Sequence, residues 1–485
     1  MYYGKTILIL VFLSCTLPLQ AGELSGTTED ITLKNAVEQA LENNLDLKLQ
    51  KAEMEISQGE LQTAKGRFDI LFSAEIGAES KEQTPFIPGI GDHEDTAKWN
   101  AKTEKLFTTG TAVSFSWNNS SYDSNALGLP FNPSYNSGLL LGVRQPLLKG
   151  FGENIQTAEI QAIEKQLASV THQVDSVAAN LAASVKRAYW NLVFAWQDIE
   201  VRKFSLELAE KLLVETKEKI NAGKLAPVEL YQPQSEVAKR EELLISAERA
   251  IGVAEDELRL LLNSENWLNS YRPVDKPATT PIQLNLPEIL KNALENRPDI
   301  KAADLSVRAV EILKENSADQ LRPDLSLVGA LGRTGTENNY GDAVNNSLDN
   351  GNNLWQIGLQ FSIPFDNSIA KGNLEKVNAQ LKIARTRAKL LRQQIRKTVR
   401  TTVRDVKLAM KALEATRKTS LATRKRLEAE QVKFKSGRAT TLDVLIAQDA
   451  YSQALSQENL TTTAYAKTLA ELDRIQGLIT LTSSP

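Results

Sequence analysis

Two long stretches of the chain carry a helical hydrophobic pattern. Apolar residues recur there at steps of three and four, which is the seam of a left-handed coiled coil. The first seam consists of Ile163, Leu167, Val170, Val174, Val177, Leu181, Val185, Ala188, Leu192, Ala195 and Ile199. The second consists of Leu374, Val377, Leu381, Ala384, Ala388, Leu391 and Ile395. A helix over 154–222 would be ~100 Å long. Because no compact globule can bury so long a stripe, we expect these helices to lie along other long helices.

Between the helical stretches, apolar and polar residues alternate with the period of a β-strand. The apolar positions are Ile70, Phe72, Ala74, Ile76 and Ala78, then Val113, Phe115 and Trp117, then Leu139, Leu141 and Val143, and finally Trp355, Ile357, Leu359, Phe361 and Ile363. Most of the intervening residues are polar or small. Five aligned apolar residues span ~10 positions, the length of a tilted membrane strand. The pattern therefore predicts strands with one face toward lipid and the other toward a water-filled lumen.

A soluble β-sandwich would show the same alternation with its apolar face turned inward. Two features argue against it: the strands are few, and the joining loops are long and polar. The segment 340–353, for example, is rich in Asn, Asp, Gly and Ser and would suit an extracellular rim.

The number of strands has a consequence for assembly. One chain offers four to six strands, too few to close around a lumen. Since an open edge in lipid leaves backbone groups unpaired, several chains must contribute to one barrel. The segment 97–107 decides between four and six strands; its three lysines obscure the alternation and leave the number open.

The chain contains an internal duplication, which is typical of a fold built from two similar halves. The sequence ALENNLDLK at residues 40–48 recurs as ALENRPDIK at residues 293–301. Each long helical pattern runs to a glycine, Gly223 or Gly437, where glycine tolerates the positive φ of a tight turn. We therefore expect a first repeat at 22–263 with strands near 68–146, a linker at 264–284, and a second repeat at 285–485 with strands near 324–364.

The first 21 residues have the pattern of a signal peptide, with a lysine, a short apolar run and a small-residue cleavage site. Cleavage after Ala21 would remove Cys15, the single cysteine, and leave a cysteine-free chain suited to an oxidising periplasm. Lipid attachment at Cys15 is the alternative, although Phe12-Leu13-Ser14 matches a lipoprotein signal poorly. No later stretch reaches the ~18 apolar residues of a membrane-spanning helix.

The composition excludes several classes of site. With two histidines and one cysteine, the chain lacks the residues for a His/Cys zinc, haem or iron–sulfur site, a cysteine nucleophile or a His-based triad. We expect no cofactor, no metal site and no enzyme activity, since carboxylate pairs such as Glu153 and Glu159 fall on helical surfaces without a pocket signal.

The charge is nearly balanced, at −3 overall, but the segment 371–426 holds eighteen Lys/Arg against three Asp/Glu. A nucleic-acid-binding helix could have that composition. The export signal argues against nucleic acid and favours a solvated or lumen-facing basic face, which would help anionic substrates.

In the order of its motifs, the chain resembles the TolC family of outer-membrane efflux proteins from Ile31 to about Leu478. The resemblance rests on the duplicated Ala-Leu-Glu-Asn segment, on QPLLKGFG at residues 145–152, and on Gly437 followed by TLDVL at residues 441–445. It implies an α+β fold: a homotrimeric transmembrane β-barrel in the outer membrane, continued by a coiled-coil helical tunnel across the periplasm. It also implies a passive channel of a tripartite efflux or type I secretion system, which docks on a periplasmic adaptor bound to an inner-membrane pump. A trimeric periplasmic stalk or adhesin without a pore is the alternative.

The resemblance also suggests residues of a gate at the helix tips. A lumen-lining aspartate of the family falls on Asp443, an acidic residue of the first hairpin on Glu229, and its aromatic partner on Phe434. The family's second entrance aspartate falls on Ile446 and its linking arginine on Ala439, beside Arg438, so the closed-state latch is in doubt. The tips themselves, Gly223, Gly437 and Arg438, would contact the adaptor. Alternatively, Asp443 simply caps the helix that follows Gly437.

Overall fold

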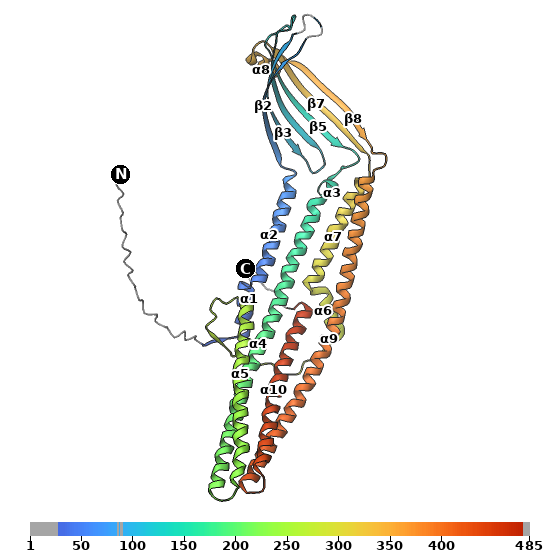
Figure 1. The fold of residues 1–485 in the computed structure, drawn as a ribbon. Helices are drawn as coiled ribbons and strands as arrows, with labels where there is room; N and C mark the ends of the chain where they lie inside the picture. The colour runs from blue at the N-terminus through green and yellow to red at the C-terminus, as the bar shows by residue number, and fades with distance from the viewer. Residues whose placement is uncertain (1–27, 85–86, 88–90, 479–485) are drawn as a thin grey trace, which may run out of the picture.

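The computed structural model describes residues 28–84, 87 and 91–478. The expected signal peptide and Cys15 lie outside these residues. The molecule is elongated, with a β-sheet at one end, a layer of long helices in the middle and two helical hairpin tips at the other end (Figure 1). Within the described residues, no helix is both long enough and apolar enough to cross a membrane.

Six strands form one antiparallel sheet in the order β2-β3-β4-β5-β7-β8. They are β2 (Ile70–Glu82), β3 (His93–Leu106), β4 (Ala112–Ser124), β5 (Ser134–Pro146), β7 (Asp324–Glu337) and β8 (Asn352–Ser362). The register aligns the apolar positions of all six strands on one face; Leu331, for example, lies between Leu141 and Trp355. This apolar face is open, with Ile76 88%, Trp355 73% and Ile357 68% exposed, far more than a soluble monomer leaves uncovered.

The segment 97–107, whose lysines left the number of strands open, lies almost entirely in strand β3 of the sheet. Its register pairs Ala101 with Trp117 on the apolar face, while Lys98 and Lys102 project from the opposite, polar face. Lys105 belongs to the apolar face, but it lies near the helical end of the sheet and its ammonium reaches the Phe68 carbonyl. The long aliphatic stem of a lysine allows this placement without leaving the charge among apolar neighbours. The alternation is therefore regular, and the sheet has six strands per chain.

The expected polar loop at 340–353 is not a loop throughout, because it contains helix α8 (Tyr340–Leu348). The Asn339 side chain accepts a hydrogen bond from the Gly341 N–H (2.8 Å) and caps the helix. On its inner side, α8 buries Ala343 and Ser347 against the apolar face of the sheet. Gly335 permits this close approach, since a Cβ at that position would lie 2.3 Å from the Ala343 carbonyl oxygen. The composition that suggested a loop is also the composition of a well-capped short helix.

The helices form a single layer below the sheet. The two longest are α4 (Ala158–Asn221) and α9 (Ser368–Lys435), ~96 and ~102 Å at ~1.5 Å per residue. In the half nearer the sheet, the order across the layer is α2 (Leu45–Gly66), α4, α7 (Pro298–Asp319) and α9. In the half nearer the tips, the order is α5 (Tyr231–Leu262), α4, α10 (Thr441–Gln476) and α9. The predicted seam of α4 is buried at most positions from Val170 to Ile199.

The duplicated Ala-Leu-Glu-Asn motif marks a break between two helices rather than the start of one. Helix α1 (Leu33–Asn43) is followed by α2, and α6 (Leu286–Asn296) by α7. The residue at each break has the same extended backbone, with φ −58° and ψ 133° at Asn44 and φ −63° and ψ 128° at Arg297. Asn44 Oδ1 accepts hydrogen bonds from the N–H groups of Asp46 and Leu47, which starts the second helix. In the other half, the proline after Arg297 disfavours helical backbone before it.

The segment between the two repeats contains a strand and fastens the layer of helices at mid-height. Strand β6 (Ser270–Pro273) pairs in parallel with β1 (Thr28–Ile31). A fully buried tyrosine in each half binds the same segment: Tyr189 donates to Asp275 Oδ2 (2.7 Å), and Tyr465 donates to the Thr280 carbonyl (2.9 Å). Short helix α3 (Glu153–Gln156) and the 3₁₀ turn η1 (Pro227–Leu230) complete the chain's described helical elements.

Candidate gate at the helix tips

The two hairpin tips are built by the same local motif. Gly223 and Gly437 have φ of +68° and +73°, the left-handed conformation that ends a helix. At the first tip, the Lys224 N–H donates to the Lys219 carbonyl and the Gly223 N–H to the Ile220 carbonyl. The corresponding pairs at the second tip are Arg438 with Lys433 and Gly437 with Phe434. This is the Schellman motif, and its repetition gives both hairpins the same turn geometry. Arg438 is exposed beside the second turn.

Asp443 caps helix α10. Its N–H donates to Thr440 Oγ1 (3.2 Å), and its carboxylate accepts from the Thr440 N–H (2.8 Å) and hydroxyl (2.6 Å), which is a capping box. These hydrogen bonds from Thr440, with a smaller contribution from Lys433 and Arg426, lower the pKa of the Asp443 carboxyl. A lowered pKa means that the cap is fully formed at neutral pH and is lost only as the pH falls through that lowered value. The side chain is also exposed, so capping and a charged surface position coexist.

Phe434 and Glu229 do not meet in the structure. Phe434 is 2% exposed and packs with Leu212, Val444 and Leu445 between the two hairpins. Glu229 lies in η1, half-buried, and no hydrogen bond or ion pair among the described residues joins its side chain to Phe434. The aromatic residue of the expected gate is therefore part of a small apolar core at the tips.

Lys219 joins the two hairpins, although no sequence motif pointed to it. Its Nζ donates to the Phe434 carbonyl (2.6 Å) and lies 3.3 Å from the centroid of the Phe434 ring, a cation–π contact. Desolvation in this position lowers the pKa of the Lys219 ammonium, and the carboxylate of Glu215 opposes that shift. From sequence, a lysine in the last turn of a helix is explained by the helix dipole alone, so no local signal distinguishes this one.

A second link joins the hairpins above the tips. Arg240 of α5 is 3% exposed; its Nη1 donates to the Ser205 carbonyl of α4 (2.6 Å) and to Gln448 Oε1 of α10 (3.2 Å). Gln448 in turn donates to the Leu208 carbonyl (3.1 Å). Three helices therefore share one buried polar network, which is stable only while its members stay paired.

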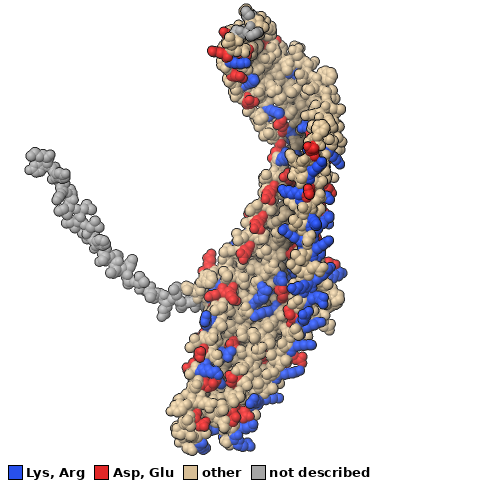
Figure 2. Space-filling model, turned by 45° about the vertical axis from the view of Figure 1, so that its right-hand side comes forward, with Lys and Arg blue, Asp and Glu red and all other residues tan. Residues whose placement is uncertain are grey.

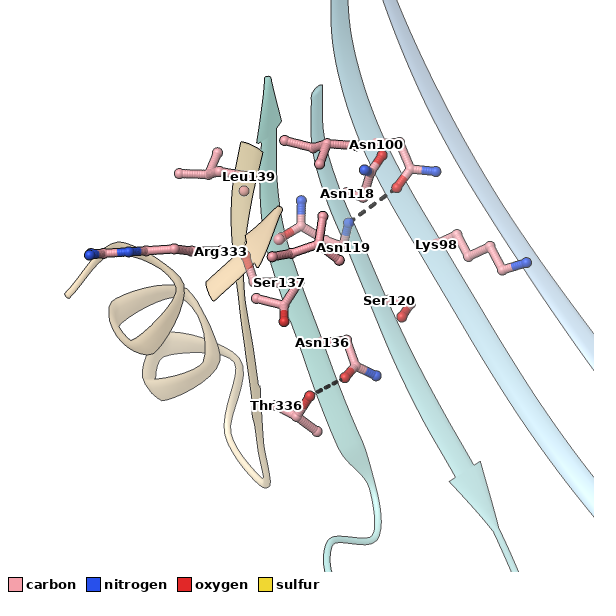
Figure 3. Close-up of a pocket in the computed structure, with 15 residues that line it drawn as sticks. Lys98, Asn100, Asn118, Asn119, Ser120, Asn136, Ser137, Leu139, Arg333 and Thr336 are labelled. Carbon is pink, nitrogen blue, oxygen red and sulfur yellow. Dashed lines mark hydrogen bonds between the residues drawn. The ribbon is translucent and has the colours of Figure 1, made fainter. Parts of the chain in front are cut away.

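At the opposite end of the molecule, the polar face of the sheet has a shallow hollow of about 560 Å³. Figure 3 shows Asn100, Asn118 and Asn136 from three neighbouring strands around it, whereas Arg333 extends toward α8 on the other side of the sheet. Eight of its fifteen lining residues are Asn, Ser or Thr, residue types that suit a surface in contact with water. No group of three or more potential metal ligands occurs among the residues that the structure describes.

Comparison with known proteins agrees with this architecture. Residues 289–478 match the family model of outer membrane efflux proteins. The cobalt-zinc-cadmium resistance protein CzcC of Cupriavidus metallidurans is 23% identical over 304 residues, which are 62% of this chain and 68% of CzcC.

Solved structures share the fold over more than nine tenths of the chain. The outer-membrane channel OprN superposes with a TM-score of 0.68 at 18% identity, covering 92% of this chain and 89% of OprN. CusC superposes with a TM-score of 0.67 at 14% identity, covering 93% of each chain. The CmeC outer membrane channel of Campylobacter jejuni gives 0.66 at 17% identity, covering 93% of this chain and 87% of CmeC.

These similarities confirm the fold class predicted from the sequence, a sheet for a transmembrane barrel continued by a long helical tunnel. The matched family model and the similar solved structures are those of outer-membrane channels, which favours the channel over a stalk without a pore. Outer membrane efflux channels are not enzymes. Residues 289–478 of the chain are thus similar in sequence to outer membrane efflux proteins, and the chain shares the fold of solved outer-membrane channels over about nine tenths of its length.

Proposed function

We propose that three copies of this chain form one continuous conduit from the periplasm to the exterior, gated at the helix tips. The observation that carries the proposal is the open six-stranded sheet with one apolar face. Its edge strands, β2 and β8, each pair with a single neighbour. Because backbone groups left unpaired in lipid cost several kcal/mol each, β8 of one copy must pair with β2 of the next. Three copies of six strands give a barrel of eighteen.

The partners follow from the family. Outer membrane efflux channels work in general as trimers with an adaptor and an inner-membrane pump. In this chain the exposed turns at Gly223 and Gly437, with Arg438, are the surface that reaches furthest from the sheet (Figure 1). We assign the adaptor contact to these turns.

The substrate class is suggested by CzcC, a cobalt-zinc-cadmium resistance protein. Cells that lack this chain should accumulate zinc, cobalt or cadmium when challenged, and expression of the chain with its adaptor and pump should restore export. Metal content measured by mass spectrometry tests this directly. If the metal content is unchanged but the sensitivity to an organic toxin is altered, the chain still acts as a conduit, and its substrate is an organic compound rather than a metal ion.

The role of Asp443 in the lumen can be separated from its role as a cap. Asp443→Asn keeps an oxygen that can accept from Thr440 but removes the negative charge. If three Asp443 carboxylates surround the entrance, this variant should lose most of the block of the open pore by divalent cations, because a ring of charge binds cations. Single-channel recording with added Mg²⁺ measures the block. Block equal to that of the unmodified protein would place Asp443 outside the lumen.

The matched control is Asp449→Asn, a change of the same charge on the same helix about two turns further along. It should leave the block unchanged. Asp443→Ala, which removes both the charge and the cap, should behave like Asp443→Asn in the block. It should also destabilise the start of α10, because the Thr440 N–H loses the carboxylate that accepts from it in the capping box.

A further inference from the structure

The apolar face of the sheet ends at a sharp boundary. On four neighbouring strands, the side chains of this face change from apolar to polar between one residue and the next on the same face. The apolar and polar residues at this change are Trp117 and Asn119 on β4, Leu139 and Ser137 on β5, Leu331 and Arg333 on β7, and Trp355 and Asn353 on β8. The register aligns the four changes to within two residues, so together they form one boundary toward the end of the sheet that carries α8 (Figure 1).

Aromatic side chains with polar tips gather just beyond this boundary. Trp99 of β3 packs edge-on against Tyr340 of α8, with ring centroids 5.1 Å apart, and its Nε1 donates to the Tyr340 hydroxyl (3.1 Å). The ring of Tyr135 on β5 lies 6.3 Å from the same tyrosine ring. Such rings, apolar in the body and polar at the tip, are typical of the interface between hydrocarbon and lipid headgroups. The boundary on the sheet therefore has the composition of the edge of a hydrocarbon layer.

A hollow of about 550 Å³ lies on the apolar face at this boundary, beside the C-terminal end of α8. Its apolar lining consists of Phe115, Leu139, Leu141, Leu331, Leu348 and Trp355. Leu331, Leu348 and Trp355 remain 63%, 55% and 73% exposed, so none of the described side chains fills the hollow. Because the hollow continues the apolar band of the sheet, a hydrocarbon chain suits it better than water does.

Arg333 lies at the rim of the hollow and is an exception in the sheet. The six strands contain two arginines, Arg144 and Arg333. Arg144 pairs with Asp324 (3.3 Å), whereas Arg333 is exposed and forms no ion pair among the described residues. Figure 2 shows that charged side chains are dense over the helices and sparse over the sheet in that view. A cation on a lipid-facing surface is costly unless an anion pairs with it, so Arg333 calls for a partner outside the chain.

Hydrogen bonds within the chain hold the Arg333 side chain beside α8 (Figure 3). Its Nε donates to Asn353 Oδ1 (3.0 Å), and its Nη1 donates to the Leu348 carbonyl (3.0 Å) at the end of α8. Capping of α8 accounts for Nη1, but Nη2 makes no hydrogen bond with any residue that the structure describes. The guanidinium therefore keeps donors for an external acceptor. Phosphate oxygens are suitable acceptors, because their negative charge strengthens the hydrogen bond.

We propose that this hollow binds an anionic lipid of the outer leaflet, with one acyl chain in the hollow and a phosphate of the headgroup paired with Arg333. The inference rests on the proposed function, which puts the apolar face in the outer membrane and the helices in the periplasm. Because α8 lies at the end of the sheet remote from the helices, the site belongs to the external leaflet (Figure 1). Each copy carries one such site, and α8 sets its position on the barrel.

Lipid binding to the purified trimer tests the site. The trimer is stripped of lipid in detergent, and either lipid A or lipid A without its phosphates is added back at rising concentrations. Native mass spectrometry counts the lipids that stay bound. We expect saturation at one lipid per copy and an apparent affinity ~tenfold higher for the phosphorylated form, because only that form offers Arg333 a charged acceptor.

Substitution of Arg333 tests the contact with the phosphate. Arg333→Gln should lower the apparent affinity for lipid A by ~tenfold and leave the affinity for the dephosphorylated form unchanged, because only a charge-assisted contact is lost. Arg333→Lys keeps the charge and should retain part of the preference for phosphate. The matched control is Arg144→Gln, which removes the other arginine of the sheet and should bind lipid A like the unmodified protein. Equal affinity of Arg333→Gln and the unmodified trimer for lipid A would overturn the proposal.

Filling the hollow tests the contact with the acyl chain. Leu331→Trp keeps the face apolar but occupies the hollow, so it should weaken binding of both forms of lipid A. The control is Leu359→Trp, the same change on the apolar face at a residue that does not line the hollow, and it should bind normally. If Leu331→Trp dissociates the trimer and the unmodified trimer binds neither lipid, protein rather than lipid covers the hollow.

The same experiments separate this inference from the proposed function. A membrane-bound trimer that binds the two forms of lipid A equally would contradict the lipid site and leave the conduit intact. A chain that is a water-soluble monomer without detergent would contradict the conduit, and the lipid site with it.

Discussion

Replacing Lys219 with methionine is expected to loosen the contact between the two hairpins of one subunit and to increase the time the channel spends open. The variant loses a charge-assisted hydrogen bond to the Phe434 carbonyl and the cation–π contact with its ring. Such a bond contributes ~1.5–3 kcal/mol when well shielded, but Lys219 is only partly buried, so screening by water reduces it. We therefore expect an increase in open probability of about three- to tenfold.

Single-channel recording of the protein in lipid bilayers measures this effect, and Lys224→Met is the control. Lys224 is an exposed lysine on the same tip, and its side chain makes no ion pair among the described residues. It should leave the open probability unchanged. If Lys219→Met and Lys224→Met behave alike, the Lys219–Phe434 contact is not part of the gate. A third variant, Lys219→Arg, keeps the charge and should recover part of the closed state.

The sequence predicted the long helices and the strands well, because burial on one side imposes a period on the chain. Val185 and Leu192 of α4 are fully buried, as their place in the seam required. The alternation of Ile70, Phe72 and Ile76 likewise identified an apolar sheet face, although nothing in one chain shows what covers it. The period of the hydrophobic pattern therefore predicts the type of element and which of its faces is apolar. Whether lipid or a neighbouring copy covers that face has to be inferred from the side chains that the single chain leaves exposed.

The features that were missed depend on single residues that break a pattern. The helix break at Asn44 lies inside a repeated helical motif, and only its ψ of 133° and its cap reveal it. β3 was uncertain because lysines belong to it, and lysine stems can pass along either face of a strand. α8 was missed because its buried positions, Ala343 and Ser347, are too small to produce a hydrophobic signal.

The candidate gate was the least predictable part. The capping interpretation of Asp443 could be read from the spacing of Thr440 and Asp443, since a capping box needs those residue types three apart. The partnership of Lys219 with Phe434 could not, because 215 residues separate them and a long flexible side chain makes the contact. Contacts between distant segments at a tip depend on how two hairpins meet, which no local pattern encodes.

Ile357→Arg should prevent most of the protein from assembling in the outer membrane. Ile357 is the middle residue of β8, it is 68% exposed, and it projects from the apolar face beside Gly329 of β7. An arginine on the lipid-facing side of a barrel costs ~2–4 kcal/mol near the membrane centre, and each trimer would contain three. The matched control is Gln356→Arg, because Gln356 is the preceding residue and projects from the polar face.

The measurement is the fraction of each variant recovered from outer-membrane vesicles as a trimer that loses its compact gel mobility on heating. The recovered trimer fraction of Ile357→Arg should fall to a tenth or less of that of the unmodified protein. The fraction of Gln356→Arg should remain within about twofold of it, because an arginine is costly on the lipid-facing side of a barrel but not on the polar side. Ile357→Leu, which preserves the apolar surface, should assemble normally. Equal recovery of the two arginine variants would mean that the apolar face does not contact lipid. The sheet would then need a protein partner on its apolar face, and neighbouring copies would have no cause to pair their edge strands into one barrel.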